Sequence, residues 1–190
     1  MPNTALLVLD IQNGIIDRLG HNSTIDDYLQ RLSTTINKAR DSGVKIIYIT
    51  TSFRPGYQDL HPNSPSTTAI KASNQFIEGD HSTQIHPAVS PDTSKGDAVV
   101  NKRRVSAFAG TDLDLILRCL DARDDLVVCG LITSGAVLST VRQAADLDHR
   151  LTVLRDLCMD RDPEVHDVLM DKVLTKQARV VVSDEWVGLL

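Results

Sequence analysis

The chain has 190 residues, of which 42% are hydrophobic and 24% charged, a composition typical of a folded globular protein that excludes a largely disordered one. Its formal net charge of −5 argues against nucleic acid as the main partner, because phosphate binding requires a basic surface. No apolar run approaches the ~18 residues of a membrane span, and no basic leader precedes the first apolar run. We therefore expect one cytoplasmic domain over residues 1–190, with no membrane partner.

The first part of the chain alternates strand and helix patterns. Ala5–Leu9 is a continuous apolar run, as expected of a central parallel strand buried on both faces, and Asp10 follows at its carboxyl end. Apolar residues then recur at helical spacing over Ser23–Arg40. Val44–Thr51 is rich in β-branched residues, which predicts the second strand.

A long segment of weak periodicity follows, from Ser52 to about Gly96. It contains five of the seven prolines, and its only helical pattern is a short one around Thr67–Phe76. Long irregular segments in compact domains usually serve function, so we interpret this one as a lid or substrate loop.

Strands and helices alternate again after this segment. In chain order we predict a strand at Asp97–Asn101, a helix at Asp112–Leu120, a strand at Leu126–Cys129, a helix at Ser134–Leu147, a strand at Arg150–Arg155, a helix opened by Pro163 and a strand at Ala178–Val182. Such alternation is typical of parallel sheets with right-handed crossovers. The fold class is therefore α/β, a three-layer α/β/α arrangement around a six-stranded parallel sheet with a Rossmann-like fold.

Polar groups follow three of the predicted strands. Asp10 and Lys102 each follow an apolar strand, and Leu131–Ala136 forms a tight turn between the fourth strand and its helix. In open α/β sheets ligands bind at the carboxyl ends of the strands, where a carboxylate, a lysine and backbone N–H groups can support acid/base chemistry. We expect Asp10 and Lys102 to end adjacent parallel strands and to form a partly buried ion pair within ~4 Å. The alternative is that Asp10 caps a loop and Lys102 is a solvated surface cation.

Three motifs resemble a known family. LLVLDIQN at Leu6–Asn13, VVNKRRVSAF at Val99–Phe108 and GLITSGAVLSTVRQAAD at Gly130–Asp146 are similar to motifs of the isochorismatase-like hydrolase superfamily, which includes nicotinamidases and N-carbamoylsarcosine amidohydrolases. Each motif alone is weak, but the three occur in order at the right strand ends, and the resemblance spans nearly the whole chain. It implies the α/β fold described above and a homodimer or homotetramer.

The resemblance also implies a set of catalytic positions. The family's catalytic aspartate falls on Asp10, its lysine on Lys102 and its nucleophilic cysteine on Ala136. It further implies a non-proline cis peptide between Leu131 and Ile132, which would direct the N–H groups of Ile132 and Ala136 to one point as an oxyanion hole.

The alanine closes the family's thioester route, because a methyl group cannot attack a carbonyl carbon. Ser134 lacks a histidine base in the sequence pattern, and Cys129 and Cys158 are interpreted as core thiols. Three interpretations remain: an enol-ether hydrolase that needs only a proton donor and water, a non-catalytic ligand-binding member of the family, and a Cys-to-Ala variant of a cysteine amidohydrolase.

The expected substrate is a small polar or carboxylated molecule, either an enol ether or an amide. Asp59 and His61 have the Asp-x-His spacing of a metal site in some family members, but a single such pair is usually a solvated loop, and we predict neither a metal nor another cofactor. The candidate substrate-binding residues are Gln12, Phe53, Arg54, Phe108 and Thr133.

Overall fold

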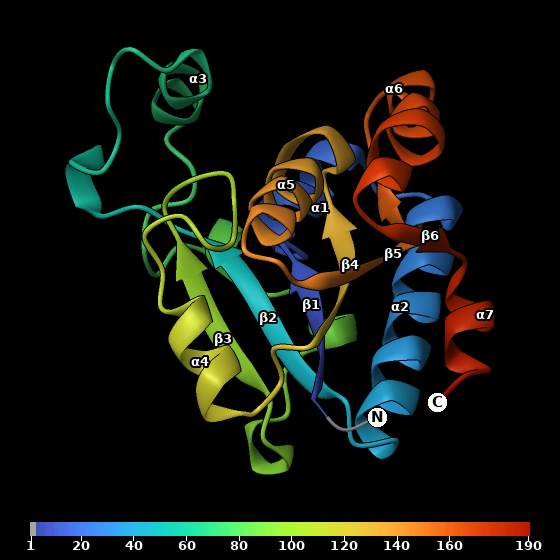
Figure 1. Ribbon diagram of the computed structural model, residues 1–190. Helices are drawn as coiled ribbons and strands as arrows, with labels where there is room; N and C mark the ends of the chain where they lie inside the picture. Colours follow the sequence, from blue (N-terminus) through green and yellow to red (C-terminus); the bar gives the residue numbers. More distant parts are fainter. Residues whose placement is uncertain (1–2) are drawn as a thin grey trace.

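A six-stranded sheet forms the centre of the molecule in the computed structural model, which describes residues 3–190 apart from the side chains of Ser66 and Thr67. All strand pairs are parallel, and the order across the sheet is β3-β2-β1-β4-β5-β6 (Figure 1). The strands are β1 Thr4–Leu9, β2 Lys45–Thr51, β3 Ala98–Lys102, β4 Asp125–Leu131, β5 Arg150–Met159 and β6 Arg179–Val181. The predicted six-stranded parallel α/β fold is confirmed.

Helices cover both faces of this sheet. One face packs against apolar side chains of α1, α2 and α7, and the other against those of α4, α5 and the chain after α6. The helices are α1 Asn13–Leu19, α2 Ser23–Asp41, α3 Pro65–Ser73, α4 Leu113–Cys119, α5 Leu138–Asp146, α6 Pro163–Val168 and α7 Ser183–Val187. Short 3₁₀ turns lie at Pro55–Tyr57, His81–Thr83, Pro87–Val89, Thr93–Lys95 and Leu174–Lys176, and π-helical turns at Thr133–Val137 and Leu169–Val173.

β1 explains why the sheet needs two helical layers. All six of its residues are buried, and alternate side chains belong to different cores: Leu7 and Leu9 to the α5 side, Leu6 and Val8 to the α2 side. A strand that buries both faces must read as an uninterrupted apolar run, as this one does.

Within residues 3–190, no helix combines the length and the apolar character needed to cross a membrane.

Several predicted boundaries were wrong. The predicted helix Ser134–Leu147 begins as the π-helical turn Thr133–Val137, and α5 itself covers only Leu138–Asp146. β5 continues four residues beyond the predicted Arg155, to Met159. The helix α1 was missed, because its seven residues are too few to display a helical period.

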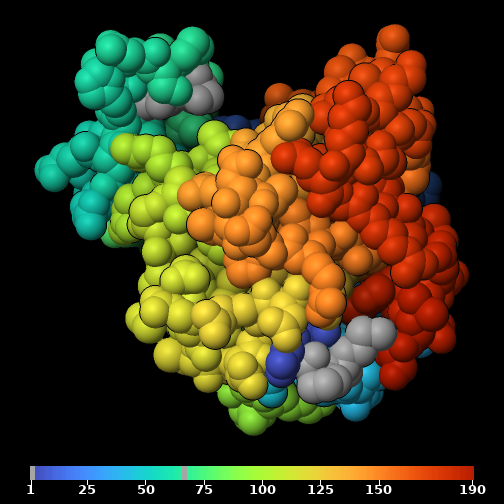
Figure 2. All heavy atoms as spheres, viewed as in Figure 1, coloured from blue at the N-terminus to red at the C-terminus, as the bar shows by residue number. Residues whose placement is uncertain are grey.

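The segment between β2 and β3 projects from the carboxyl edge of the sheet, where α3 stands apart from the body (Figures 1 and 2). Its own small core consists of Phe53, Tyr57 and Phe76. The segment returns to the body at α1, where Gly14 leaves room for Ser82: a Cβ on Gly14 would lie 2.7 Å from that of Ser82. The segment interpreted as a lid or substrate loop is therefore held both by its own small core and by its packing against α1.

Candidate active site

Asp10 lies directly after the central strand β1. Its φ of 54° is in the left-handed region, which aspartate tolerates better than most residues, and its N–H donates to the carbonyl of Ile49 at 2.8 Å. The residue is only 5% exposed. This local turn places the carboxylate at the carboxyl edge of the sheet.

Lys102, the last residue of β3, pairs with this carboxylate. Its Nζ lies 2.7 Å from Asp10 Oδ2, and Lys102 is 3% exposed. The ion-pair geometry predicted from the sequence is confirmed, and the alternative of a solvated surface lysine is wrong. The two strands are not adjacent, however, because β2 lies between β1 and β3.

Thr51 connects the two charged groups across the end of β2. It is the last residue of β2, and its hydroxyl accepts a hydrogen bond from Lys102 Nζ at 2.6 Å and donates one to Asp10 Oδ1 at 2.9 Å. Each oxygen of the Asp10 carboxylate therefore has a partner: the Thr51 hydroxyl for Oδ1 and the Lys102 ammonium for Oδ2. Sequence reasoning missed Thr51, although its position at a strand end was a signal that could have found it.

The turn after β4 has the predicted backbone. The peptide bond between Leu131 and Ile132 is cis, as expected from the family resemblance. Gly130 precedes it with a φ of 123°, and a Cβ there would lie 2.2 Å from the carbonyl oxygen of Leu9, so only glycine fits beside β1. In the π-helical turn that follows, the N–H groups of Gly135 and Val137 both donate to the carbonyl of Ile132.

A cavity of about 430 Å³ opens over these strand ends. The catalytic positions expected from the resemblance all line it: Asp10, Lys102, Ile132 and Ala136. Its other lining residues are Ile15, Arg18, Thr51, Phe53, Leu60, His61, Ser64, Ile70, Phe76, Arg103, Arg104, Val105, Leu131 and Gly135. No cysteine is among the described residues of this lining.

Of the five candidate substrate-binding residues, only Phe53 lines the cavity. Gln12 is fully buried elsewhere, and its amide bonds the backbone of Thr51 at N–H and carbonyl and the carbonyl of Thr83. Arg54 is exposed and ion-pairs with Asp59. Neither side chain is therefore proposed as a substrate contact.

Phe108 and Thr133 also lie outside the cavity lining. Phe108 belongs to the core on the α5 side and stacks on His149, with ring centroids 5.7 Å apart. Thr133 is fully buried, and its hydroxyl lies 2.9 Å from Nδ1 of His166. Burial, followed by the charge of Arg155, lowers the pKa of His166. Phe108 therefore contributes to the core, and Thr133 links the turn after β4 to His166 of α6.

The cysteines of the chain are not placed to act as nucleophiles in this cavity. Cys129 and Cys158 are buried, and burial raises the pKa of Cys158 to about 12 and the pKa of Cys129 well above its usual value. A thiol with so high a pKa is not a nucleophile at neutral pH. Cys119 is exposed on α4, away from the cavity lining.

The Asp-x-His pair does not form part of a metal cluster. Asp59 is engaged by Arg54 and Arg103, and hydrogen bonds from Arg54 lower its pKa although burial opposes that shift. His61 lies in the cavity lining, where Nδ1 accepts the N–H of Asn63. Within residues 3–190, no group of three or more His, Cys, Asp or Glu side chains is arranged to hold a metal ion.

Comparisons with known proteins show the family to which the chain belongs. The isochorismatase domain model matches residues 4–185. The isochorismatase family protein YecD of Escherichia coli O157:H7 is 30% identical over 190 residues, which cover 98% of this chain and 96% of YecD. The chain therefore belongs to the isochorismatase family, a family of hydrolases.

Two further proteins are similar to this chain, one in sequence and one in fold. The ureidoacrylate amidohydrolase RutB of Stutzerimonas stutzeri is 28% identical over 180 residues, covering 85% of this chain and 71% of RutB. A cysteine hydrolase from Pseudomonas syringae has the same fold, with a TM-score of 0.88 at 22% identity over 98% of this chain and 91% of that one.

Proposed function

We propose that this protein hydrolyses a small carboxylated molecule by direct addition of water, with Asp10 as the acid/base and Lys102 as its electrostatic partner. The observation that carries the proposal is the buried Asp10–Lys102 ion pair in the lining of the cavity. Ala136 lines the same cavity, at the position to which the resemblance assigns the family's cysteine. A buried carboxylate facing a cavity is a suitable proton-transfer group.

The alanine selects among the reactions of the family. Without a nucleophilic side chain no acyl-enzyme forms, so the substrate must react with water directly. Hydrolysis of an enol ether meets this condition: a proton adds to the double-bond carbon, water adds to the resulting cation, and the adduct releases its alcohol. The proton comes from the Asp10–Lys102 pair: Lys102 passes it to the Asp10 carboxylate, which delivers it to the substrate carbon, and Asp10 then takes a proton from the attacking water and so restores the pair.

The N–H groups of Ile132 and Ala136 are the proposed donors to the leaving alcohol oxygen as the adduct breaks down, or to the carbonyl oxygen of an amide substrate. The π-helical turn supports this assignment, because Ile132 at its start and Ala136 within it both line the cavity. An amide substrate is the second candidate, favoured by the similarity to ureidoacrylate amidohydrolase. A homodimer or homotetramer is proposed on the family resemblance alone, and a cytoplasmic location on the sequence pattern alone.

Three proteins test the function: the unchanged chain, Asp10→Asn and Ala136→Cys, each assayed against isochorismate and a panel of small amides. We expect the unchanged chain to hydrolyse the enol ether, and Asp10→Asn to lose roughly 10²–10⁴-fold in rate because it cannot transfer the proton. Asp17→Asn, an exposed change on the neighbouring helix, is the matched control.

The outcomes separate the interpretations. Amide turnover by Ala136→Cys but not by the unchanged chain would favour a cysteine amidohydrolase with its nucleophile replaced. An absence of turnover in all three proteins would overturn the catalytic proposal and favour a ligand-binding member of the family.

A further inference from the structure

The cavity carries more positive charge than its catalytic pair requires. Lys102 is neutralised by Asp10, and Arg103 pairs with Asp59 and Glu78. Arg18 and Arg104 also line the cavity, but within residues 3–190 neither pairs with a carboxylate. Both are exposed, which places them at the cavity mouth.

Neutral groups hold the two guanidinium groups in place. Arg18 lies over the Phe76 ring at 4.9 Å from its centroid and donates through Nε and Nη2 to the side chains of Gln75 and Ser73. Arg104 donates through Nη1 to the carbonyl of Asp59 at 2.9 Å and to that of its neighbour Arg103. Among the residues that the structure describes, no partner occupies Arg18 Nη1 or Arg104 Nη2, so both can bind a ligand. Guanidinium groups held in this way lose little entropy when a ligand binds.

The wall between the mouth and the floor is apolar. It consists of Ile15, Phe53, Leu60, Ile70, Phe76 and Val105. A ligand made only of polar groups would leave these apolar side chains exposed to water. An aromatic or branched aliphatic group would bury them instead. The cavity therefore has three zones: an acid/base floor, an apolar wall and a cationic mouth.

We infer that the ligand is a carboxylic acid with an apolar body about the size of a phenyl ring, whose carboxylate is bound by Arg18 and Arg104 at the cavity mouth. This assignment rests on the proposed function only for the reacting end of the molecule, which would reach Asp10. It narrows the substrate from small carboxylated molecules in general to acids with a substantial apolar part, and it names two specificity-determining residues.

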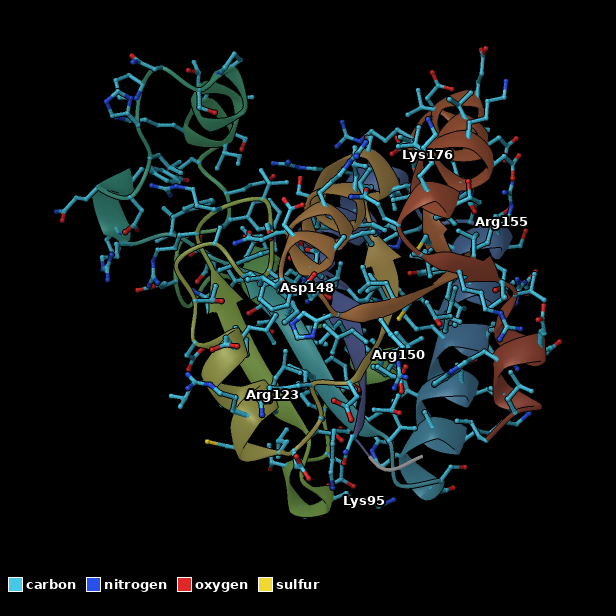
Figure 3. The ribbon with its side chains drawn as sticks, viewed as in Figure 1. Lys95, Arg123, Asp148, Arg150, Arg155 and Lys176 are labelled. Atoms are coloured by element: carbon cyan, nitrogen blue, oxygen red, sulfur yellow. The ribbon has the colours of Figure 1, made fainter. Side chains whose placement is uncertain are left out.

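Three matched probes test the inference by calorimetry at low salt: cinnamate, its neutral amide cinnamamide, and acrylate, which keeps the carboxylate but lacks the ring. We expect cinnamate to bind about tenfold or more tightly than either of the others, because hydrogen bonds to a charged group and burial of the ring each contribute on that scale. Arg18→Gln and Arg104→Gln should each reduce the preference for cinnamate over cinnamamide and leave the binding of cinnamamide unchanged. Arg123→Gln is the control, since Arg123 lies near α4, away from α3 and outside the cavity lining (Figure 3).

The inference is overturned if cinnamate binds no better than cinnamamide, if neither binds at millimolar concentration, or if either arginine variant keeps the full preference. Repeating the titrations in Asp10→Asn separates this test from that of the function. In the unchanged chain, acid preference without turnover would contradict the proposed reaction alone, whereas turnover without acid preference would contradict the arginine assignment alone.

Discussion

Lys102 Nζ lies 2.7 Å from Asp10 Oδ2 although the strands that carry the two residues are separated by β2. The long lysine side chain crosses the end of β2, where Thr51 receives one of its hydrogen bonds. Both charged residues are more than nine-tenths buried, so each depends on the other for the polar environment that water would supply.

The first prediction concerns the stability of this pair. Lys102→Met leaves the Asp10 carboxylate buried without its cation, and we expect the free energy of unfolding to fall by about 3–5 kcal/mol. The double variant Lys102→Met with Asp10→Asn removes both charges and should recover most of that loss. Urea denaturation of the two single variants and the double variant measures the coupling. Simple addition of the two single effects would show that the pair is not coupled.

The second prediction concerns thiol reactivity. In the native protein only Cys119 should react rapidly with iodoacetamide, because burial raises the pKa values of Cys129 and Cys158. Ala136→Cys should add a second fast thiol, activated by Lys102 and by the helix amino terminus. Ala144→Cys, in the buried core, should add none. Peptide mapping after timed alkylation identifies each site, and a slow thiol at position 136 would argue against an activated nucleophile position.

Much of the architecture could be predicted because buried parallel strands read as continuous apolar runs, of which β1 and β4 are clear examples. The positions of Asp10 and Lys102 followed from the strand ends. The order of the strands in the sheet could not be read from the sequence. The hydrogen bonds of Thr51 to both charged residues were therefore missed. Likewise, a glutamine such as Gln12 looks the same in a sequence whether its amide contacts a substrate or holds two loops together.

The third prediction concerns alkaline pH. All three tyrosines have raised pKa values, chiefly through burial: Tyr48 to about 12, Tyr28 well above its usual value and Tyr57 above it. Between pH 10 and about 12 the unfolded chain loses phenolic protons that the folded chain keeps, so the free energy of unfolding must fall as pH rises through this window. Below pH 10 the contribution is constant.

Absorbance at 295 nm and urea denaturation, both followed from pH 8 to pH 11.5, check this expectation. Tyr48→Phe should weaken the alkaline loss, because it removes a phenol whose pKa burial raises to about 12. Phenolate absorbance that rises at pH 10 in the folded protein would contradict the assigned burial.

The fourth prediction concerns the glycine at the catalytic turn. Gly130→Ala would place a methyl group 2.2 Å from the Leu9 carbonyl oxygen, so β1 and β4 must separate, and we expect a loss of more than about 4 kcal/mol. Gly56→Ala is the matched control. Gly56 also has a positive φ, of 79°, but nothing lies within 4 Å of its added Cβ, so its loss should be about 1 kcal/mol. Equal losses in the two variants would show that φ alone, not the contact with Leu9, requires glycine at position 130.

The last prediction distinguishes two roles for Gln12. Its buried amide donates to the carbonyls of Thr51 and Thr83 at 2.9 Å and 2.7 Å, and accepts the Thr51 N–H at 2.7 Å, so it joins β2 to the segment that carries α3. Gln12→Leu would leave these three backbone groups without partners, and we expect a loss of about 2–4 kcal/mol. Hydrogen exchange should accelerate around Thr51 and Thr83 first, because those amides lose their tether. Gln30→Leu, an exposed change on α2, should do neither. A Gln12→Leu variant with unchanged stability and exchange but weaker ligand binding would instead restore Gln12 as a substrate contact, since only a residue that touches the ligand would act on binding alone.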